Sequence, residues 1–196
     1  MTDINTPPDV SELFNKITVW AENLGFQQLG VSDVNLSEAE SALSVWLADQ
    51  FHGEMDYMAR HGVKRTQPGA LVEGTVRVIT VRMDYWPEQA AEPWAVMKDD
   101  QKGFISRYAL GRDYHKLMRR RLAKLAEKIK AEVGEMSYRV FCDSAPVMEK
   151  ALAEKSGIGW QGKHSNILNR EHGSFFFLGE IYTDLPLPLT EPTSDH

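Results

Sequence analysis

Residues 76–86, VRVITVRMDYW, are dense in β-branched and apolar side chains. This composition is typical of a β-strand and gives the strongest strand prediction in the sequence. Shorter segments on either side predict the rest of a sheet. They are FQQLGV (26–31), FISRYA (104–109), SYRVFCD (137–143), and a hairpin of NILNR (166–170) and SFFFLGEIYT (174–183) around the turn EHGS.

Apolar residues at helical spacing predict helices between these strands. The first begins after Ser11 as N-cap, and the second covers 38–51. The longest covers 112–132, and Pro146 begins a further helix through residue 155. The resulting order α-β-α-β-β-α-β-α-β-β predicts an α/β sandwich with a mixed sheet rather than a simple parallel doubly wound sheet.

The composition is that of an ordinary soluble globular protein. The 196 residues are 42% hydrophobic and 26% charged, with a mean hydropathy of −0.38, which excludes disorder, a collagen-like repeat and a membrane span. We expect one domain over 11–185, a loose leader at 1–10 and an extended proline-rich linker at 186–196. The N-terminus shows no signal peptide, so a cytoplasmic location is expected.

Charge and cysteine content exclude several kinds of site. Twenty-two basic and 28 acidic residues give a net charge of −6, which is not the overall charge of a general nucleic-acid binder. The single cysteine, Cys142, excludes an intrachain disulfide, a four-cysteine zinc site and an iron–sulfur site within the chain. The six histidines show no metal-ligand spacing.

The motif GIGWQG at 157–162 matches the glycine fingerprint of dinucleotide-binding proteins, with Asp184 about where an acidic residue is expected. The context differs, because the motif follows a predicted helix and leads into a predicted hairpin. A dinucleotide site follows a strand and opens a helix. Glycines that shape a tight turn are the favoured interpretation, and close approach of 157–165 to another bulky ligand stays open.

Asp143 lies where the strand 137–143 ends and the helix after Pro146 begins. On sequence alone it is more simply an N-cap of that helix, a role that Ser144 can also fill. The alternative is a partly buried carboxyl group at a strand end, whose raised pKa would suit proton donation.

The helix at 112–130 concentrates positive charge. Eight basic and two acidic side chains give this segment +6 in a chain of −6. A solvated helix face is the more common explanation of such a run. The same charge would also suit contacts with nucleic-acid phosphates, and Lys64 and Arg65 could add to it.

Three segments together resemble the cobalamin-binding half of epoxyqueuosine reductases. They are MDYMARHGVKRTQPGALVEGTVRVITV (55–81), GFISRYALGRDYHKLMRRRLAKLA (103–126) and DSAPVMEKALAEKSGIGWQGKHSNILNREHGSFFFLGEIYTDLPL (143–187). DSAPVMEKALA and GIGWQGKHS are the most specific blocks. The resemblance implies an enzyme that reduces epoxyqueuosine to queuosine at the tRNA wobble position, with cobalamin and two 4Fe–4S clusters, in a fold similar to the flavin nitroreductase-like α/β sandwich.

The resemblance also implies roles for particular residues. Asp143, the aspartate of D-S-A-P, would be the general acid, since removing the epoxide oxygen develops oxyanion character that a proton donor relieves. Other positions match places where the family contacts the corrin ring or its polar groups. These cofactor-binding positions are Arg65, Ser106, Asp143, Gly159, Trp160, Gly162, Lys163 and Ser165, with Gly157 shaping the same loop.

In the family, a linker like LPLPLTEPTSDH (185–196) leads into a ferredoxin-like domain whose cysteines hold both clusters. The resemblance therefore predicts a fragment that binds cobalamin and tRNA but does not reduce the epoxide alone. The implied partners are the anticodon stem–loop of tRNA bearing epoxyqueuosine and an electron donor acting through the ferredoxin-like domain, with no membrane contact.

Three other functions stay open. GIGWQG and the expected fold also fit a flavin- or nicotinamide-dependent nitroreductase-like enzyme. A corrinoid carrier or binding module would use the same blocks without catalysis. A reductive dehalogenase shares cobalamin and clusters but acts on organohalides.

Overall fold

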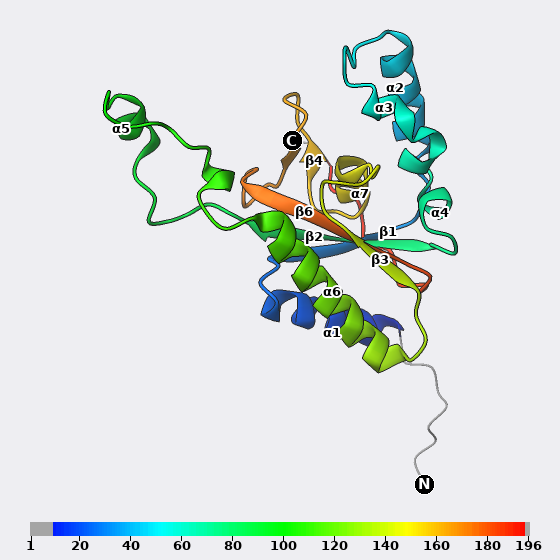
Figure 1. The fold of residues 1–196 in the computed structure, drawn as a ribbon. Helices are drawn as coiled ribbons and strands as arrows, with labels where there is room; N and C mark the ends of the chain where they lie inside the picture. The colour runs from blue at the N-terminus through cyan, green and yellow to red at the C-terminus, as the bar shows by residue number, and fades with distance from the viewer. Residues whose placement is uncertain (1–9, 195–196) are drawn as a thin grey trace.

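The computed structural model describes residues 10–194, in which a four-stranded sheet carries helices on both faces (Figure 1). The strands β1 (Gln28–Ser32), β2 (Arg77–Asp84), β6 (Phe176–Thr183) and β3 (Tyr138–Phe141) lie in that order across the sheet. β2 and β6 pair along eight residues each. The strand prediction at 76–86 is confirmed, and β2 lies inside the sheet.

Side chains alternate along the strands and separate two cores. On one face, α1 (Val10–Asn23) and α6 (Tyr114–Val133) cover Ile79, Val81 and Ile181, all fully or almost fully buried (Figure 1). On the other face, α7 (Glu149–Lys155) covers Val78 and Tyr182. Each buried aliphatic side chain contributes about 1.5–3 kcal/mol relative to exposure, so both faces stabilise the sheet.

Smaller elements surround the α7 face. The strands β4 (Trp160–Gln161) and β5 (Ile167–Leu168) form a short antiparallel pair next to α7. A group of helices follows β1 in the sequence and stands beyond one end of the sheet (Figure 1). It consists of α2 (Ser37–Ala48), α3 (Tyr57–Arg60), the 3₁₀ helix η1 (Gly62–Arg65) and α4 (Pro68–Leu71).

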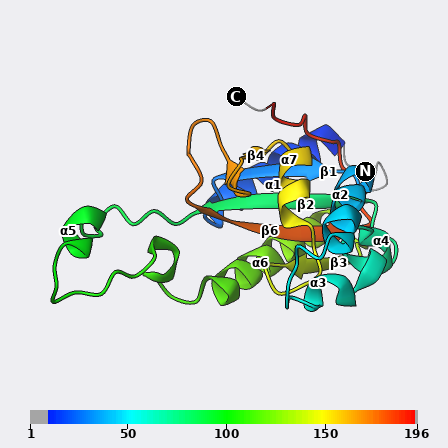
Figure 2. The same ribbon diagram turned by 90° about the horizontal axis from the view of Figure 1, so that it is seen from above.

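An arm formed by residues 85–113 extends away from the body between β2 and α6 (Figure 2). It contains α5 (Pro93–Met97) and the 3₁₀ helix η2 (Arg107–Ala109). Its exposed apolar side chains include Trp86, Trp94 and Phe104. The arm returns to the body where Tyr108 packs edge-on against Tyr114, at 6.3 Å between ring centroids.

The prediction of a mixed sheet is wrong, because every strand pairing among the described residues is antiparallel. β6 inserts between β2 and β3 and runs opposite to both of them. The predicted hairpin is also wrong in its pairing. β5 pairs with β4, and the bridge between Asn169 and Gly173 lies at the expected turn.

The strand predicted at 104–109 is not formed. These residues lie on the arm, away from the sheet, and end in η2 (Figure 2). Apolar composition alone does not make a strand, because a strand needs a partner whose backbone groups complete its hydrogen bonds.

Three helix ends differ from the expectation. α1 begins at Val10, so Ser11 lies inside the helix, and most of the predicted leader lies outside the described residues. α2 ends at Ala48, short of residue 51. α7 begins at Glu149 rather than Pro146, because residues 143–148 form a loop.

The proline-rich segment 185–194 has no regular secondary structure but contacts the body. The Thr190 backbone N–H donates to the carbonyl of Val31, and its hydroxyl donates to the carbonyl of Ser156 at 2.7 Å. Within the part of the chain that the structure describes, no helix is long and apolar enough to cross a bilayer.

Candidate functional site

The loop after β3 places Asp143 at the surface of a cleft. Cys142 is buried at the end of the strand, and the next residue turns out of the sheet with a φ of +58°. Aspartate tolerates this left-handed conformation better than most residues with a Cβ, because its short polar side chain can form local hydrogen bonds. The Asp143 side chain keeps 39% of its exposure and is therefore accessible to a ligand.

Two aromatic side chains from the first turn of α6 orient the Asp143 carboxyl group. The Tyr114 hydroxyl donates to Oδ2, and His115 Nε2 lies 3.1 Å from the same oxygen. The Tyr114 ring stacks on Phe177 of β6 at 3.7 Å between centroids. Burial, and then the hydrogen bond to Asp143, raise the pKa of Tyr114, so its phenol keeps its proton and acts as a donor.

His115 also contacts Asp113, the N-cap of α6. The distance between His115 Nδ1 and Asp113 Oδ1 is 3.1 Å, and the Asp113 side chain also accepts the His115 backbone N–H. An acceptor at Nδ1 favours a proton on that nitrogen and fixes the orientation of the ring. The order Asp113–His115–Asp143 is thus an arrangement that can move a proton to or from Asp143 Oδ2.

Two further carboxyl groups interact with Asp143. Burial, and then the charge of Asp143, raise the pKa of Glu149 to about 7. Glu180 on β6 is fully buried, and neither of its side-chain oxygens has a hydrogen-bond partner within residues 10–194. Burial and the charge of Glu149 raise the pKa of Glu180 well above its usual range, which favours a neutral carboxyl group at this position.

Three cavities adjoin one another in this region. The central one has a volume of about 190 Å³ and is lined by Asp143 and Glu149. It shares Tyr85 and Phe177 with a cavity of about 460 Å³ between α6 and the base of the arm. It shares Glu149 and Lys150 with a cavity of about 490 Å³ toward α2.

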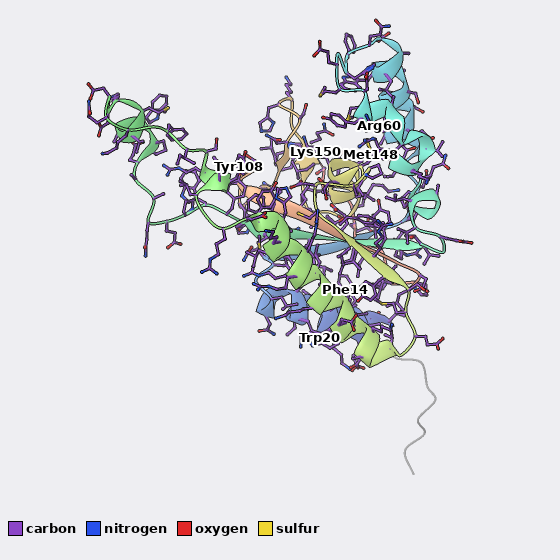
Figure 3. All side chains as sticks on the ribbon, in the orientation of Figure 1. Phe14, Trp20, Arg60, Tyr108, Met148 and Lys150 are labelled. Carbon is purple, nitrogen blue, oxygen red and sulfur yellow. The ribbon has the colours of Figure 1, made fainter. Side chains whose placement is uncertain are left out.

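The cleft lies on the α7 side of the sheet. Figure 3 shows Met148 and Lys150 there, with Tyr108 of the arm on the same side and with Phe14 and Trp20 of α1 on the opposite side. The larger core fills most of the α1 side, and the cavity between α6 and the base of the arm adjoins that core at Met83.

Two of the predicted cofactor-binding residues line the cavity toward α2, namely Arg65 and Ser165. Arg65 is only 9% exposed; one guanidinium nitrogen donates to the carbonyl of Tyr57 at 3.2 Å, and its buried Nε has no partner among the described residues. A buried guanidinium N–H without an acceptor costs free energy, so this atom favours a ligand oxygen in the cavity.

The other predicted positions do not line this cavity. Ser106 lies on the arm just before η2, and Lys163 is exposed in the turn between β4 and β5. Trp160 belongs to β4, where it pairs with Leu168. The predicted role of these residues in cofactor binding stays a prediction.

The packing of the fold accounts for a glycine in the GIGWQG segment (157–162). The segment follows α7 and leads into β4, so the context of a dinucleotide site is absent from it, as the sequence indicated. A Cβ on Gly159 would lie 2.1 Å from the carbonyl oxygen of Leu168. The close approach of β4 and β5 therefore requires glycine here, whether or not a ligand is bound.

The sequence did not identify Tyr114, His115 or Glu149 as site residues. Tyr114 has helical spacing with the core positions of α6, which is the pattern of an ordinary core residue. Its neighbour His115 and the N-cap Asp113 form a run of polar and aromatic residues, D-Y-H, at a helix start, which is a weak signal of function. The contact with Asp143 joins residues 29 positions apart and has no sequence signal.

Comparison with known proteins identifies relatives of this chain. Residues 65–144 match the family model described as "Epoxyqueuosine reductase QueG, DUF1730". The epoxyqueuosine reductase of Escherichia coli is 54% identical over 192 residues, which are 98% of this chain and 50% of that protein. The chain spans about half the length of the curated relatives it matches.

Solved structures show the same fold. An epoxyqueuosine reductase bound to an epoxyqueuosine-modified tRNA-Tyr stem loop matches with a TM-score of 0.80 at 20% identity, covering 96% of this chain and 49% of that one. The Bacillus subtilis enzyme, with its aspartate-bearing catalytic loop swung out of the active site, matches with a TM-score of 0.79 at 20% identity, covering 96% and 49%. The resemblance stated from the motifs is confirmed.

Proposed function

We propose that this chain forms the cobalamin-binding half of an epoxyqueuosine reductase, with Asp143 as the proton donor in the reduction of epoxyqueuosine at the tRNA wobble base. The domain would cover 11–185, with 186–196 as the connection to the rest of the enzyme. One observation carries the proposal: in a chain 54% identical to such enzymes, Asp143 lines the cavity that adjoins two larger ones and is oriented by Tyr114 and His115.

The residues of the cavity toward α2 fit a corrin. Cobalamin presents a broad apolar ring with amide groups at its edge, and this cavity combines Trp46 and Met58 with the buried Arg65. The unpartnered Nε of Arg65 would donate to an amide oxygen, and Ser165 offers a second polar contact at the rim. Cobalamin held there would supply reducing electrons for breaking the carbon–oxygen bond.

The chain's own residues would manage the proton. Asp143 would donate to the oxygen that leaves the epoxide carbon, while Tyr114 holds its carboxyl group in place. His115 lies close enough to Asp143 Oδ2 to return a proton after each transfer, and Asp113 would stabilise the charged imidazole. The loop 143–148 would have an inward and an outward position. In the structure of the Bacillus subtilis enzyme, the catalytic loop is swung out of the active site.

The donor set of this chain does not fit iron–sulfur clusters. Cys142 is its one cysteine, it is buried, and burial raises the pKa of its thiol. The clusters and the electron donor would therefore belong to the other half of the enzyme. A cytoplasmic location and a relation to the flavin nitroreductase-like fold remain part of this proposal.

Cofactor binding gives the direct test. The purified chain is mixed with cobalamin or, in a parallel sample, with flavin, and desalted. It is expected to keep a corrin absorbance band, and Arg65→Ala is expected to weaken cobalamin binding by about 10-fold because one buried charge-assisted hydrogen bond is lost. Arg60→Ala, on the neighbouring helix α3, is the matched control. A retained flavin band and no corrin band would favour the nitroreductase-like alternative instead.

The positive face of α6 predicts contact with tRNA. Arg120 and Lys124 are exposed, whereas Arg121 is partly buried against the carbonyl of Gly25. Replacing Arg120 and Lys124 together by glutamate is expected to weaken tRNA binding and to lower the slope of log affinity against log salt by about 2. The measurement is a filter-binding series in salt.

The matched control for that series replaces Lys98 and Lys102 of the arm by glutamate. An unchanged affinity for tRNA in the α6 variant, with corrin bound normally, would leave the charged face as a solvated helix surface.

A further inference from the structure

The backbone N–H of Asp143 donates to the Glu149 carboxylate, with 2.7 Å between N and Oε1. This hydrogen bond closes the loop 143–148 on itself, because Glu149 is the first residue of α7. We propose that Glu149 is a latch, a positioning residue that holds Asp143 in its inward position through this bond. The role of Asp143 in catalysis rests on the proposed function, whereas the latch is a property of the chain itself.

The loop has few other backbone anchors near Asp143. The neighbouring backbone bonds join Ser144 to Cys142 and Val147 to Ala145, and both lie within the same stretch of chain. The Asp143 side chain is held from α6 by Tyr114 and His115. The bond from Glu149 therefore connects the backbone of the aspartate to the helix that is packed on the sheet.

Glu149 is suited to this role by its surroundings. No lysine or arginine among residues 10–194 forms an ion pair with it within 4.0 Å, so no salt bridge competes with the hydrogen bond from the Asp143 N–H. An ionised carboxylate accepts a shorter and stronger hydrogen bond than a neutral carbonyl group. Its partly buried position also limits competition from water.

The strength of the latch should depend on pH. Burial and the charge of Asp143 raise the pKa of Glu149 to about 7, so its carboxyl group is charged at pH 8 and largely neutral at pH 6. The neutral acid is the weaker acceptor, and the loop should open more often at pH 6. The ionisable groups that face Glu149 are Asp143, Cys142, Tyr114 of α6, Lys150 of α7, Glu180 and Tyr182 of β6, and Arg65 across the cavity.

Amide hydrogen exchange, followed by NMR on the 22.2 kDa chain, tests the latch without cofactor, tRNA or turnover. Glu149→Ala is expected to lower the protection factor of the Asp143 amide about 10- to 100-fold at pH 8, because the hydrogen bond to a charged acceptor is lost. Glu149→Gln keeps a carbonyl acceptor but cannot ionise. In the Glu149→Gln variant, the protection factor of the Asp143 amide at pH 8 should equal that of the unchanged chain at pH 6.

The control is Glu154→Ala, which also removes a carboxylate from α7. The Glu154 carboxylate accepts a hydrogen bond from the Gln161 backbone N–H, at 3.4 Å, and not from Asp143. This variant should leave the Asp143 amide unchanged. The proposal is overturned if Glu149→Ala changes protection less than two-fold, or if protection in the unchanged chain is the same at pH 6 and pH 8. If the alanine variant does not fold, the glutamine variant and the pH comparison still decide.

The outcome is independent of the proposed function. A chain that shows the latch but keeps no corrin would overturn the proposed function and leave the role of Glu149 intact. A chain that binds corrin and shows no effect of Glu149 on the Asp143 amide would support the proposed function and overturn the latch.

Discussion

Asp143→Asn is expected to lower epoxyqueuosine turnover by about 10²- to 10⁴-fold while cobalamin stays bound, because a positioned general acid contributes about that much to a rate. The measurement uses this chain joined to the half of the Escherichia coli relative that it does not match. Asparagine keeps the size of aspartate, tolerates the φ of +58° and can still accept the hydrogen bond from Tyr114. The substitution removes the exchangeable carboxyl proton and the charge of the carboxylate.

The matched control is Asp49→Asn, an equal loss of charge at the exposed end of α2. Turnover within a few-fold of the unchanged protein, with corrin bound normally, would mean that Asp143 has only a local structural role. The proton would then come from another donor near the cavity, such as Tyr108 or Tyr114.

Gly159→Ala is expected to destabilise the fold by about 1–3 kcal/mol or more, the usual cost of forcing extra volume into a packed site. The added Cβ would lie 2.1 Å from the backbone oxygen of Leu168 and 2.9 Å from Ile167 Cγ2. A backbone oxygen cannot rotate away as a side chain can, so β4 and β5 must separate. Urea unfolding measures the loss.

Two glycines serve as controls for this substitution. At Gly162 the added Cβ would meet the His164 ring and a Leu168 methyl group at 2.8 Å, and side-chain ends can move. At Gly69 nothing lies within 4 Å, so Gly69→Ala should change stability by less than about 0.5 kcal/mol. A Gly159→Ala variant that keeps its stability and loses cobalamin affinity would instead assign this glycine to the cofactor.

The parts of the fold that the sequence predicted are those with a local signal. β2 follows from its β-branched residues, and α6 follows from apolar positions repeated over five turns. The segment 104–109 has the composition of a strand but lies on the arm, where no neighbouring strand offers hydrogen bonds. Pairing depends on distant segments, which also explains why the position of β6 between β2 and β3 was missed.

The candidate site follows the same division. Asp143 was found because a motif surrounds it and because a strand end is a common place for a functional carboxyl group. Tyr114 and His115 reach Asp143 only because α6 packs against β3, the strand that ends next to Asp143. The sequence places Glu149 inside a helix that begins at Pro146. In the structure Glu149 is the first residue of α7, because residues 143–148 form a loop.

The position of β6 has a consequence for how the protein is made. β2 and β3 both pair with β6, which follows the other strands of this sheet in the sequence, and about ninety residues separate the paired segments of β2 and β6. At a translation rate of about 5–20 residues per second, the open edge of β2 waits roughly 5–20 s for its partner. A nascent chain therefore exposes a strand rich in valine and isoleucine during that interval, when aggregation or chaperone binding competes with completion of the sheet.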